Sequence, residues 1–513
     1  GNAAQRAKIS KLAADLAKVL GVSSAAAAAS SEDQFHSLGY LNLEKAESVL
    51  NEFSKVLTQV QREADVALIL KLNCARMVVD LCCRVKDNIA SFEVAGDKAS
   101  VVAWKQNCNV QLCALKWLGL LCKSRLARLV LLLTGRVTLL ADVATAYLDM
   151  HFAEALKPQD VEGGPVLFLP QLLHVLALHM KQAPPEGARE LQGSLAAYLI
   201  LCGLAEKLRE LFGRAEIRLK LFDGASPLPL LLLRAMCFLH ILVTAYRRPG
   251  GAQPEANSSP EVVAAIAASH ERVLETLRNT ELFGVVGILV SILLSEGRRE
   301  KGAKLPQTVV SLCVQALRIL NCVAQIDLKT LQKTMGAGAG RQQELYHVLV
   351  TLLDYCVARI PGSVTKPTTS QGQPEESELL HETVVLLGFY CLEAPQNQTI
   401  LCYGEGQVLL CRLAALPLHY FMEERGKSIL FPTILASCYE SEQNLDVLRS
   451  EMNLSLLKNF LNAQIAQGEE ARSPDGLPPF SCRFPPALWQ AAVAFFDGTP
   501  KEEHSAEEIG VNA

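Results

Sequence analysis

The chain has 513 residues, of which half are apolar and a fifth are charged. Its mean hydropathy of +0.20 is high for a soluble protein, so most of the chain must bury a core, which excludes disorder for the bulk of it. The 49 basic and 53 acidic residues give a formal charge of −4, so only local basic patches could attract nucleic acid or anionic lipid.

Helical periodicity dominates from the N-terminus onward. Apolar residues recur at steps of three and four in the windows 43–60 and 309–324, and Asn42 is a candidate N-cap for the first window. Alternating period-two stretches are nearly absent. The sequence therefore predicts an all-α protein, and we interpret it as an armadillo/HEAT-like helical-repeat solenoid.

Breaks rich in Pro, Gly and Ser divide the helical pattern. They predict an N-terminal helix with an Ala/Ser linker, two halves of a solenoid, a C-terminal helix packed on the solenoid, and a disordered acidic tail. The expected boundaries are 1–30, 31–248, 261–466, 480–497 and 498–513, with further loops at 158–165, 182–188, 361–376 and 467–479.

One segment, residues 227–246, approaches the ~20 apolar residues that a bilayer span needs. Arg234 and His240 lie inside it, and an arginine in the centre of a bilayer is costly. A buried inner helix of a solenoid gives the same pattern, so we predict a core helix and no membrane span here.

A repeat near the C-terminus is the most informative internal feature. Residues 397–410 read NQTILCYGEGQVLL and residues 444–457 read NLDVLRSEMNLSLL. The offset from Asn397 to Asn444 is 47 residues (444 minus 397), at the upper end of the HEAT/armadillo range. Such helices cannot bury their apolar faces alone, so neighbouring repeats must stack.

The 16 cysteines are scattered and never form CxxC pairs, so they are interpreted as small buried hydrophobes of a reducing compartment. The first residues lack the apolar core of a signal peptide, and we expect a cytoplasmic protein. Because the chain begins with Gly1 and enters a helical pattern at once, we also expect it to be a segment of a longer protein.

No motif assembles a catalytic group, a metal site or a cofactor site. His174 and His179 are five residues apart, which does not place them on one face of a helix as the i, i+4 pair of a zinc protease would be. The GAGAGR segment at 336–341 follows a helical pattern, and no Lys-Ser/Thr pair closes it into a phosphate-binding loop. We therefore predict no enzyme activity, no cofactor and no metal.

Basic clusters are the remaining functional signal, because each could contact phosphates. Three clusters occur. The first has its centre at 123–128 and is flanked by Lys116 and Arg136, the second runs from 207 to 218 and is followed by Lys220, and the third spans 298–304. The candidate RNA-contacting residues are Lys123, Arg125 and Arg128 in the first cluster, Lys207, Arg209, Arg214 and Arg218 in the second, and Arg298, Arg299, Lys301 and Lys304 in the third. Glutamates interleave with the second and third clusters, so the alternative is that these are solvated helix faces.

From about His381 to Phe496 the chain resembles the C-terminal helical domain of the SCAPER family, the S-phase cyclin A-associated proteins in the endoplasmic reticulum. The matching segments are ETVVLLGFYCLEAPQNQTIL at 382–401, the Leu416-Pro417 to Tyr420-Phe421 step, the Leu430 to Tyr439 helix, Asn444 to Met452, and RFPPALWQAAVAFF at 483–496. The zinc-finger segment of that family has no counterpart here.

This resemblance implies a non-enzymatic adaptor of the cytosol and of the cytosolic face of the endoplasmic reticulum. Its partners would be a translating ribosome, reached through rRNA phosphates, and a tetratricopeptide factor that recognises nascent tubulin. A Ccr/Not-type deadenylase complex, recruited through parts outside this segment, would then degrade the tubulin message. The alternative is a scaffold that holds cyclin A and its kinase at the endoplasmic reticulum.

Overall fold

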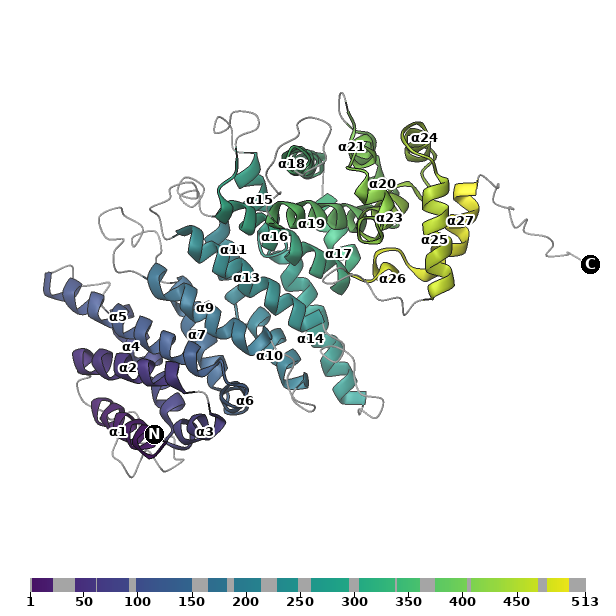
Figure 1. Cartoon of the computed structure of the whole chain (residues 1–513). Helices are drawn as coiled ribbons and strands as arrows, with labels where there is room; N and C mark the ends of the chain where they lie inside the picture. The colour runs from purple at the N-terminus through teal and green to yellow at the C-terminus, as the bar shows by residue number, and fades with distance from the viewer. Residues whose placement is uncertain are drawn as a thin grey trace, which may run out of the picture. The chain divides into compact units, whose positions relative to one another are not determined.

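The structure is a computed structural model that describes residues 2–21, 42–60, 62–91, 98–149, 165–181, 189–213, 228–247, 260–294, 304–336, 339–359, 374–403, 407–468 and 478–497. Every regular element in these ranges is a helix (Figure 1). The prediction of an all-α protein is confirmed for the part of the chain described. Of the expected linkers and the tail, residues 22–30 of the Ala/Ser linker, 182–188 and 498–513 lie outside it, as do most of 158–165, 361–376 and 467–479.

The contacts divide the chain into two units, residues 1–288 with 306–322 and residues 289–305 with 323–513. The first unit contains α1 (Asn2–Val19), α2 (Leu43–Gln59), α3 (Glu63–Lys71), α4 (Cys74–Ser91), α5 (Lys98–Leu121), α6 (Arg125–Leu133), α7 (Arg136–Asp149), α9 (Pro165–Lys181), α10 (Arg189–Leu201), α11 (Leu204–Gly213), α13 (Leu228–Arg247) and α14 (Pro260–Asn279). Two helices, α15 (Val285–Leu293) and α16 (Gln307–Ile326), have residues in both units.

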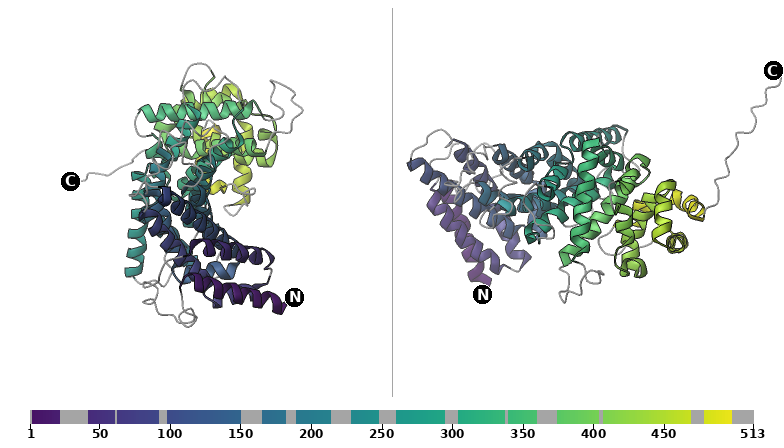
Figure 2. Two further views of the ribbon diagram at one scale, coloured as in Figure 1. Left: turned by 90° about the vertical axis from the view of Figure 1, so that its left-hand side faces the viewer. Right: turned by 90° about the horizontal axis from the view of Figure 1, so that it is seen from above.

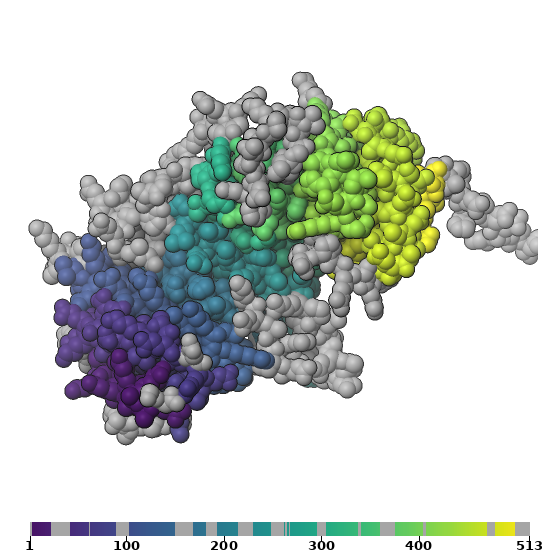
Figure 3. Space-filling view, in the orientation of Figure 1, coloured from purple at the N-terminus to yellow at the C-terminus, as the bar shows by residue number. Residues whose placement is uncertain are grey.

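The helices of the first unit pack in rows. The long helices form one row in which α2 contacts α5, α5 contacts α9 and α9 contacts α13 (Figures 1 and 2). Behind it, α4 packs against α7 and α7 against α11, while the short helices α3 and α6 pack together. On the face seen in Figure 3, the side chains of α1 and α2 close the space between these two helices.

Helix α2 shows how the sequence pattern produces this packing. Its apolar stripe at Ala46, Leu50, Phe53 and Leu57 is buried, and Phe53 meets Trp117 of α5 edge-to-face with ring centroids 5.2 Å apart. The Asn42 side chain accepts a hydrogen bond from the backbone N–H of the third helical residue. The predicted N-cap is therefore confirmed, since this bond satisfies one of the donors that a helix start leaves unpaired.

The second unit is built around two long helices, α19 and α23, that pack side by side. It contains α17 (Leu328–Gly336), α18 (Ala339–Val357), α19 (Pro374–Cys391), α20 (Pro395–Gln398), η3 (Thr399–Cys402), α21 (Leu409–Ala414), α22 (His419–Met422), α23 (Glu424–Cys438), α24 (Glu442–Glu451), α25 (Ser455–Gln467), α26 (Phe480–Arg483), η4 (Pro486–Leu488) and α27 (Trp489–Asp497). Helices α17 and α18 pack on α19, and α24 to α26 pack on α23.

The 47-residue repeat is visible in hydrogen bonds. The Asn397 side chain donates to the carbonyl of Tyr390 at the end of α19, at 2.9 Å. The Asn444 side chain donates to the carbonyl of Ser437 at the end of α23, at 2.8 Å. Each asparagine thus satisfies a carbonyl seven residues before it, one that the end of the helix leaves without a helical donor.

Two further features follow the same offset. Glu393 and Glu440 both adopt a left-handed backbone, with φ of 48° and 61°. A buried glutamine also caps each helix end: Gln332 donates to the carbonyls of Phe389 and Leu392, and Gln398 donates to those of Ala436 and Tyr439. These two pairs of acceptors are again 47 residues apart (436 minus 389, and 439 minus 392). The two turns are therefore built alike.

Helix α13 contains most of the apolar segment considered as a membrane span. It and α16 are long and apolar enough to cross a bilayer, and 61% and 72% of their most apolar windows are buried within the protein. The bent pair α6 and α7 passes the same test of length and composition, with an 81° break. In α13, Arg234 is exposed, His240 lies 3.0 Å from the Gln315 side chain, and the helix packs on α9 and α10. This packing favours the core-helix interpretation.

Candidate nucleic-acid interface

The corner between α5 and α6 carries the central residues of the first basic cluster. Helix α5 ends at Leu121, and Arg125 is the first residue of α6, whose first turn holds no acidic residue. Lys123 and Arg125 are exposed, and neither forms an ion pair with a described residue. Lys116, one turn and a half before the end of α5, is also exposed. Three cations of this cluster therefore face solvent.

Arg128, the third central residue, is only 8% exposed. Its Nη1 donates to the carbonyl of Cys122 at 2.6 Å and to that of Lys123 at 3.1 Å, and burial lowers the pKa of its guanidinium. These carbonyls lie at the end of α5, where helical donors are missing. Arg128 thus stabilises the turn between α5 and α6. The solvent-exposed cations of this cluster are Lys116, Lys123 and Arg125.

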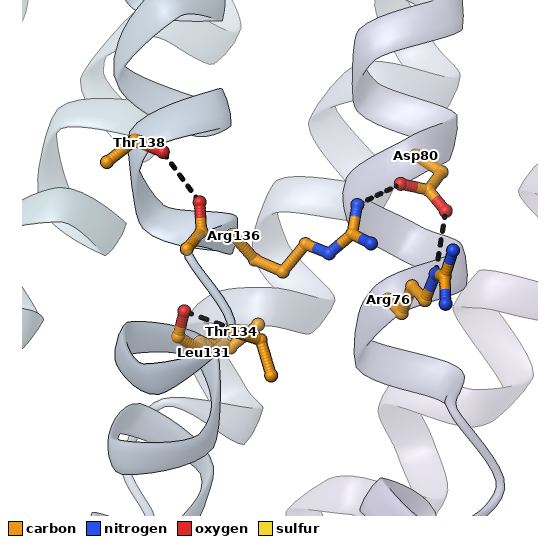
Figure 4. Close-up of polar contacts among 7 residues, drawn as sticks. Arg76, Asp80, Leu131, Thr134, Arg136 and Thr138 are labelled. Atoms are coloured by element: carbon orange, nitrogen blue, oxygen red, sulfur yellow. Dashed lines mark hydrogen bonds and ion pairs between the residues drawn. The ribbon is translucent and has the colours of Figure 1, made fainter. Parts of the chain in front are cut away.

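Arg136, which flanks the cluster, is bound within the fold (Figure 4). Its Nη1 lies 2.9 Å from a carboxylate oxygen of Asp80, whose other oxygen lies 3.7 Å from Nε of Arg76. Burial raises the pKa of Asp80, while Arg136 and Arg76 oppose the rise. The pair joins α7 to α4, so Arg136 contributes to the packing of these helices.

The second cluster is partly neutralised by glutamates. Nζ of Lys207 lies 3.3 Å from Glu210, and a guanidinium nitrogen of Arg209 lies 3.9 Å from Glu281. Both pairs are partly exposed to solvent, so each contributes little to stability, but each reduces the local positive potential. Arg214, Arg218, Lys220, Arg298, Arg299 and Lys301 lie outside the described residues. In the third cluster Lys304 is described and exposed.

The most chemically suggestive pair in the first unit is Cys122 with His179, whose Sγ and Nε2 are 3.9 Å apart. Burial raises the pKa of Cys122 to about 12 and lowers that of His179 to about 4. A reactive cysteine needs a thiolate stabilised by a cation, and this environment disfavours both charges. Among the described residues, no three His, Cys, Asp or Glu side chains gather as a metal site would require.

Sequence reasoning missed the two roles that remove arginines from the surface. Arg128 donates hydrogen bonds to two carbonyls five and six residues before it. A basic residue shortly after the end of a helix can predict a cap of this kind. Arg136 and Asp80 are 56 residues apart, and no local pattern pairs them. Only the registration of α4 against α7 brings these two residues together.

No protein-family profile matches the chain. One curated human protein, the S phase cyclin A-associated protein in the endoplasmic reticulum of Homo sapiens, is 25% identical over 236 residues. The match covers 43% of this chain and 16% of the human protein, so it supports at most a distant relationship to that family.

Proposed function

We propose that this chain is a non-enzymatic adaptor that docks on translating ribosomes together with a tetratricopeptide factor that recognises nascent tubulin. In this role it helps to recruit a deadenylase complex, so that tubulin mRNA is degraded when tubulin is in excess. It acts in the cytoplasm and at the cytosolic face of the endoplasmic reticulum. The distant relative named above and the resemblance over His381 to Phe496 support this proposal.

We further propose that the helices form an armadillo/HEAT-like solenoid. The rows of packed helices in the first unit support this arrangement, because repeat proteins stack equivalent helices on one another. The shared caps and left-handed turns after α19 and α23 support it in the second unit. A solenoid offers several surfaces at once, which is what an adaptor requires.

The observation that carries the ribosome proposal is the exposed pair Lys123 and Arg125. They occupy a corner where Arg128 fixes the backbone, so the two cations are presented on a rigid turn. Arginine and lysine on such a turn bind phosphate oxygens without reading sequence. Ribosomal RNA presents a dense array of phosphates, and binding to it would weaken with salt.

Co-sedimentation with ribosomes tests this proposal. The chain is mixed with ribosomes that carry a tubulin nascent chain and with the tetratricopeptide factor, then centrifuged through sucrose. The double variant Lys123→Glu/Arg125→Glu should lose most of its binding, while Lys45→Glu on α2 should bind as the wild type does. Absence of wild-type binding even at low salt would contradict the proposal, as would undiminished binding by the double variant.

The second candidate is a scaffold for cyclin A and its kinase, favoured by the name of the relative, which describes that protein as cyclin A-associated. Purified cyclin A with its kinase, passed over the immobilised chain, distinguishes the two. Retention of cyclin A without ribosome binding would favour the scaffold. Ribosome binding without retention of cyclin A would favour the adaptor.

A further inference from the structure

Four long helices that contribute to the first unit contain no acidic residue. They are α5, α9, α13 and α16, with 24, 17, 20 and 20 residues. The chain as a whole has 53 acidic residues among 513, a frequency at which these helices would hold about eight. Their basic residues are Lys98, Lys105, Lys116, Lys181, Arg234, Arg247 and Arg318. Burial depletes both signs of charge, so it does not explain this imbalance.

Each of the four helices has a stripe of partly or fully exposed side chains, while other partly exposed residues, such as Trp104 on α5 and Leu233 on α13, lie outside these stripes. The stripes follow steps of three and four residues, so each lies on a single helix face. Together we name them the acid-free row. Its members are Val102, Lys105, Asn109, Leu112 and Lys116 on α5, Gln171, His174 and Leu178 on α9, Leu230, Arg234, Cys237 and Ile241 on α13, and Ser311, Gln315 and Arg318 on α16.

Contacts between the helices make neighbouring stripes continuous. A Cβ atom placed on Gly119, one turn beyond Lys116 on α5, would lie 2.6 Å from the side-chain nitrogen of Gln171 on α9. The amide of Gln171 therefore rests directly on α5. On α13, Nδ1 of His240, adjacent to Ile241, lies 3.0 Å from the side-chain oxygen of Gln315 on α16. Helices α9 and α13 also pack against each other.

The row is electropositive. Lys105, Lys116 and Arg234 are exposed and form no ion pair with a described residue. Near its other end, burial together with the positive charges of Arg318 and Arg247 lowers the pKa of His240 to about 4. The four stripes themselves carry cations and no carboxylate, and Glu47 of the neighbouring helix α2 lies near Lys116, since both charges act on the pKa of Cys113. An excess of positive charge favours an anionic partner.

We propose that the acid-free row binds an extended, acidic peptide segment of a partner protein. Adjacent packed helices are ~8–10 Å apart and an extended chain advances about 3.3 Å per residue, so about three residues bridge one helix to the next. The exposed amide of Asn109 can donate and accept, which suits the N–H and C=O groups of a peptide backbone. The amide nitrogen of Gln315, whose oxygen lies against His240, adds further N–H donors. The cations of α5 and of α13 are two helix steps apart, so they would face acidic side chains about six residues apart in the peptide.

A peptide suits the row better than single-stranded RNA does. Proteins that bind single strands combine a basic groove with aromatic side chains on which bases stack. The row contains no Phe, Tyr or Trp, and His174 is its one aromatic ring. Apart from His174, Cys237 and Ser311, its residues between the cations are amides and aliphatic side chains such as Leu112, Leu230 and Ile241. Aliphatic side chains pack against the apolar residues of a peptide and offer little to a base.

Fluorescence anisotropy with the whole chain tests this proposal. The probe is a fluorescein-labelled peptide of about twelve residues with Glu at every third position and Ser or Ala between, long enough to span four helices. Its companions replace every Glu with Lys or halve the length, and an oligouridine of similar length serves as the competitor. The full-length acidic peptide should bind best, and the Lys peptide should show no binding.

Two charge-reversal variants complete the test. Lys105→Glu/Arg234→Glu alters the row outside the basic cluster at the α5–α6 corner, and Lys45→Glu/Lys71→Glu makes the same change at exposed sites of α2 and α3. The row variant should raise the Kd for the acidic peptide about tenfold, because reversal of two exposed charges turns attraction into repulsion. The control should leave the Kd unchanged. Equal binding of acidic and Lys peptides, or an unchanged Kd in the row variant, would overturn the proposal.

RNA is the alternative that the competitor examines. If oligouridine displaces the peptide and binds more tightly, the row is an RNA surface and the peptide proposal is overturned. The proposal is independent of ribosome docking, because its variants leave Lys123 and Arg125 intact. Ribosome co-sedimentation can therefore fail while the acidic peptide binds, and the reverse also holds.

Discussion

Replacing Arg483 with Met should loosen the second unit. Arg483 is only 3% exposed, and its guanidinium donates to the carbonyls of Ser428 and Ile429, both at 2.6 Å, and to the hydroxyl of Thr433 at 3.0 Å. Pro432 lies inside α23 and has no N–H, so the carbonyl of Ser428, four residues earlier, has no helical donor. Arg483 supplies the missing donor and ties α26 to α23.

The cost follows from these bonds. Methionine fills a similar volume but leaves the Ser428 carbonyl unpaired and removes a second charged donor from Ile429, at roughly 1–3 kcal/mol for each group. The substitution also removes the desolvation penalty of a buried cation, which offsets part of this loss. That penalty is reflected in the pKa of Arg483, which burial lowers to about 9. We expect a net loss of about 3 kcal/mol in the free energy of unfolding. Arg483→Lys should lose less, since an ammonium can still reach one carbonyl.

Hydrogen–deuterium exchange with mass spectrometry and urea unfolding followed by circular dichroism measure the effect. Exchange reports local opening, so peptides from α23 and α26 should lose protection while those from α4 and α5 keep theirs. Arg449→Met, at an exposed arginine paired with Asp446, is the control and should change stability by less than ~0.5 kcal/mol. Unchanged protection of α23 in Arg483→Met would refute the reasoning about Pro432.

Three smaller predictions follow from other buried or strained groups. Burial lowers the pKa of His179 to about 4, so between pH 7 and pH 4 the unfolded state binds a proton that the folded state lacks. About 3 kcal/mol of the free energy of unfolding should therefore be lost as the pH falls from 7 to 4. In His179→Gln the urea midpoint should change less over this pH range than in the wild type. Gln398→Leu leaves the carbonyls of Ala436 and Tyr439 without their amide donor and should cost about 2 kcal/mol by chemical denaturation, whereas the exposed Gln396→Leu should cost little. Glu393→Gly relieves a left-handed backbone at an exposed position, so calorimetry should show a gain of up to ~1 kcal/mol; a loss would contradict the description of this turn.

The sequence predicted those features that depend on neighbours along the chain. The α2 stripe with its Asn42 cap needed only a period of 3.6 and a capping preference. The 47-residue offset was visible because Asn397 and Asn444 repeat a local device at the end of a helix. In each case the residues that interact are within seven positions of one another.

Features that depend on tertiary packing could not be predicted in this way. Arg128 was grouped with Lys123 and Arg125 because charge patterning cannot distinguish a surface arginine from one that turns back to cap a buried helix end. The bond from Arg483 to Ser428 spans 55 residues, although Pro432 signals that a carbonyl in α23 needs a donor from elsewhere. The registration of helices decides which residue supplies that donor.

The salt dependence of ribosome binding tests the central claim most directly. Lys123 and Arg125 release counterions when they bind rRNA phosphates, so the logarithm of the binding constant should fall linearly with the logarithm of salt concentration. The double variant Lys123→Glu/Arg125→Glu should bind more weakly and with a slope smaller by about two, roughly one for each phosphate that the variant no longer neutralises. Equal slopes for the variant and the wild type would show that this corner does not touch RNA.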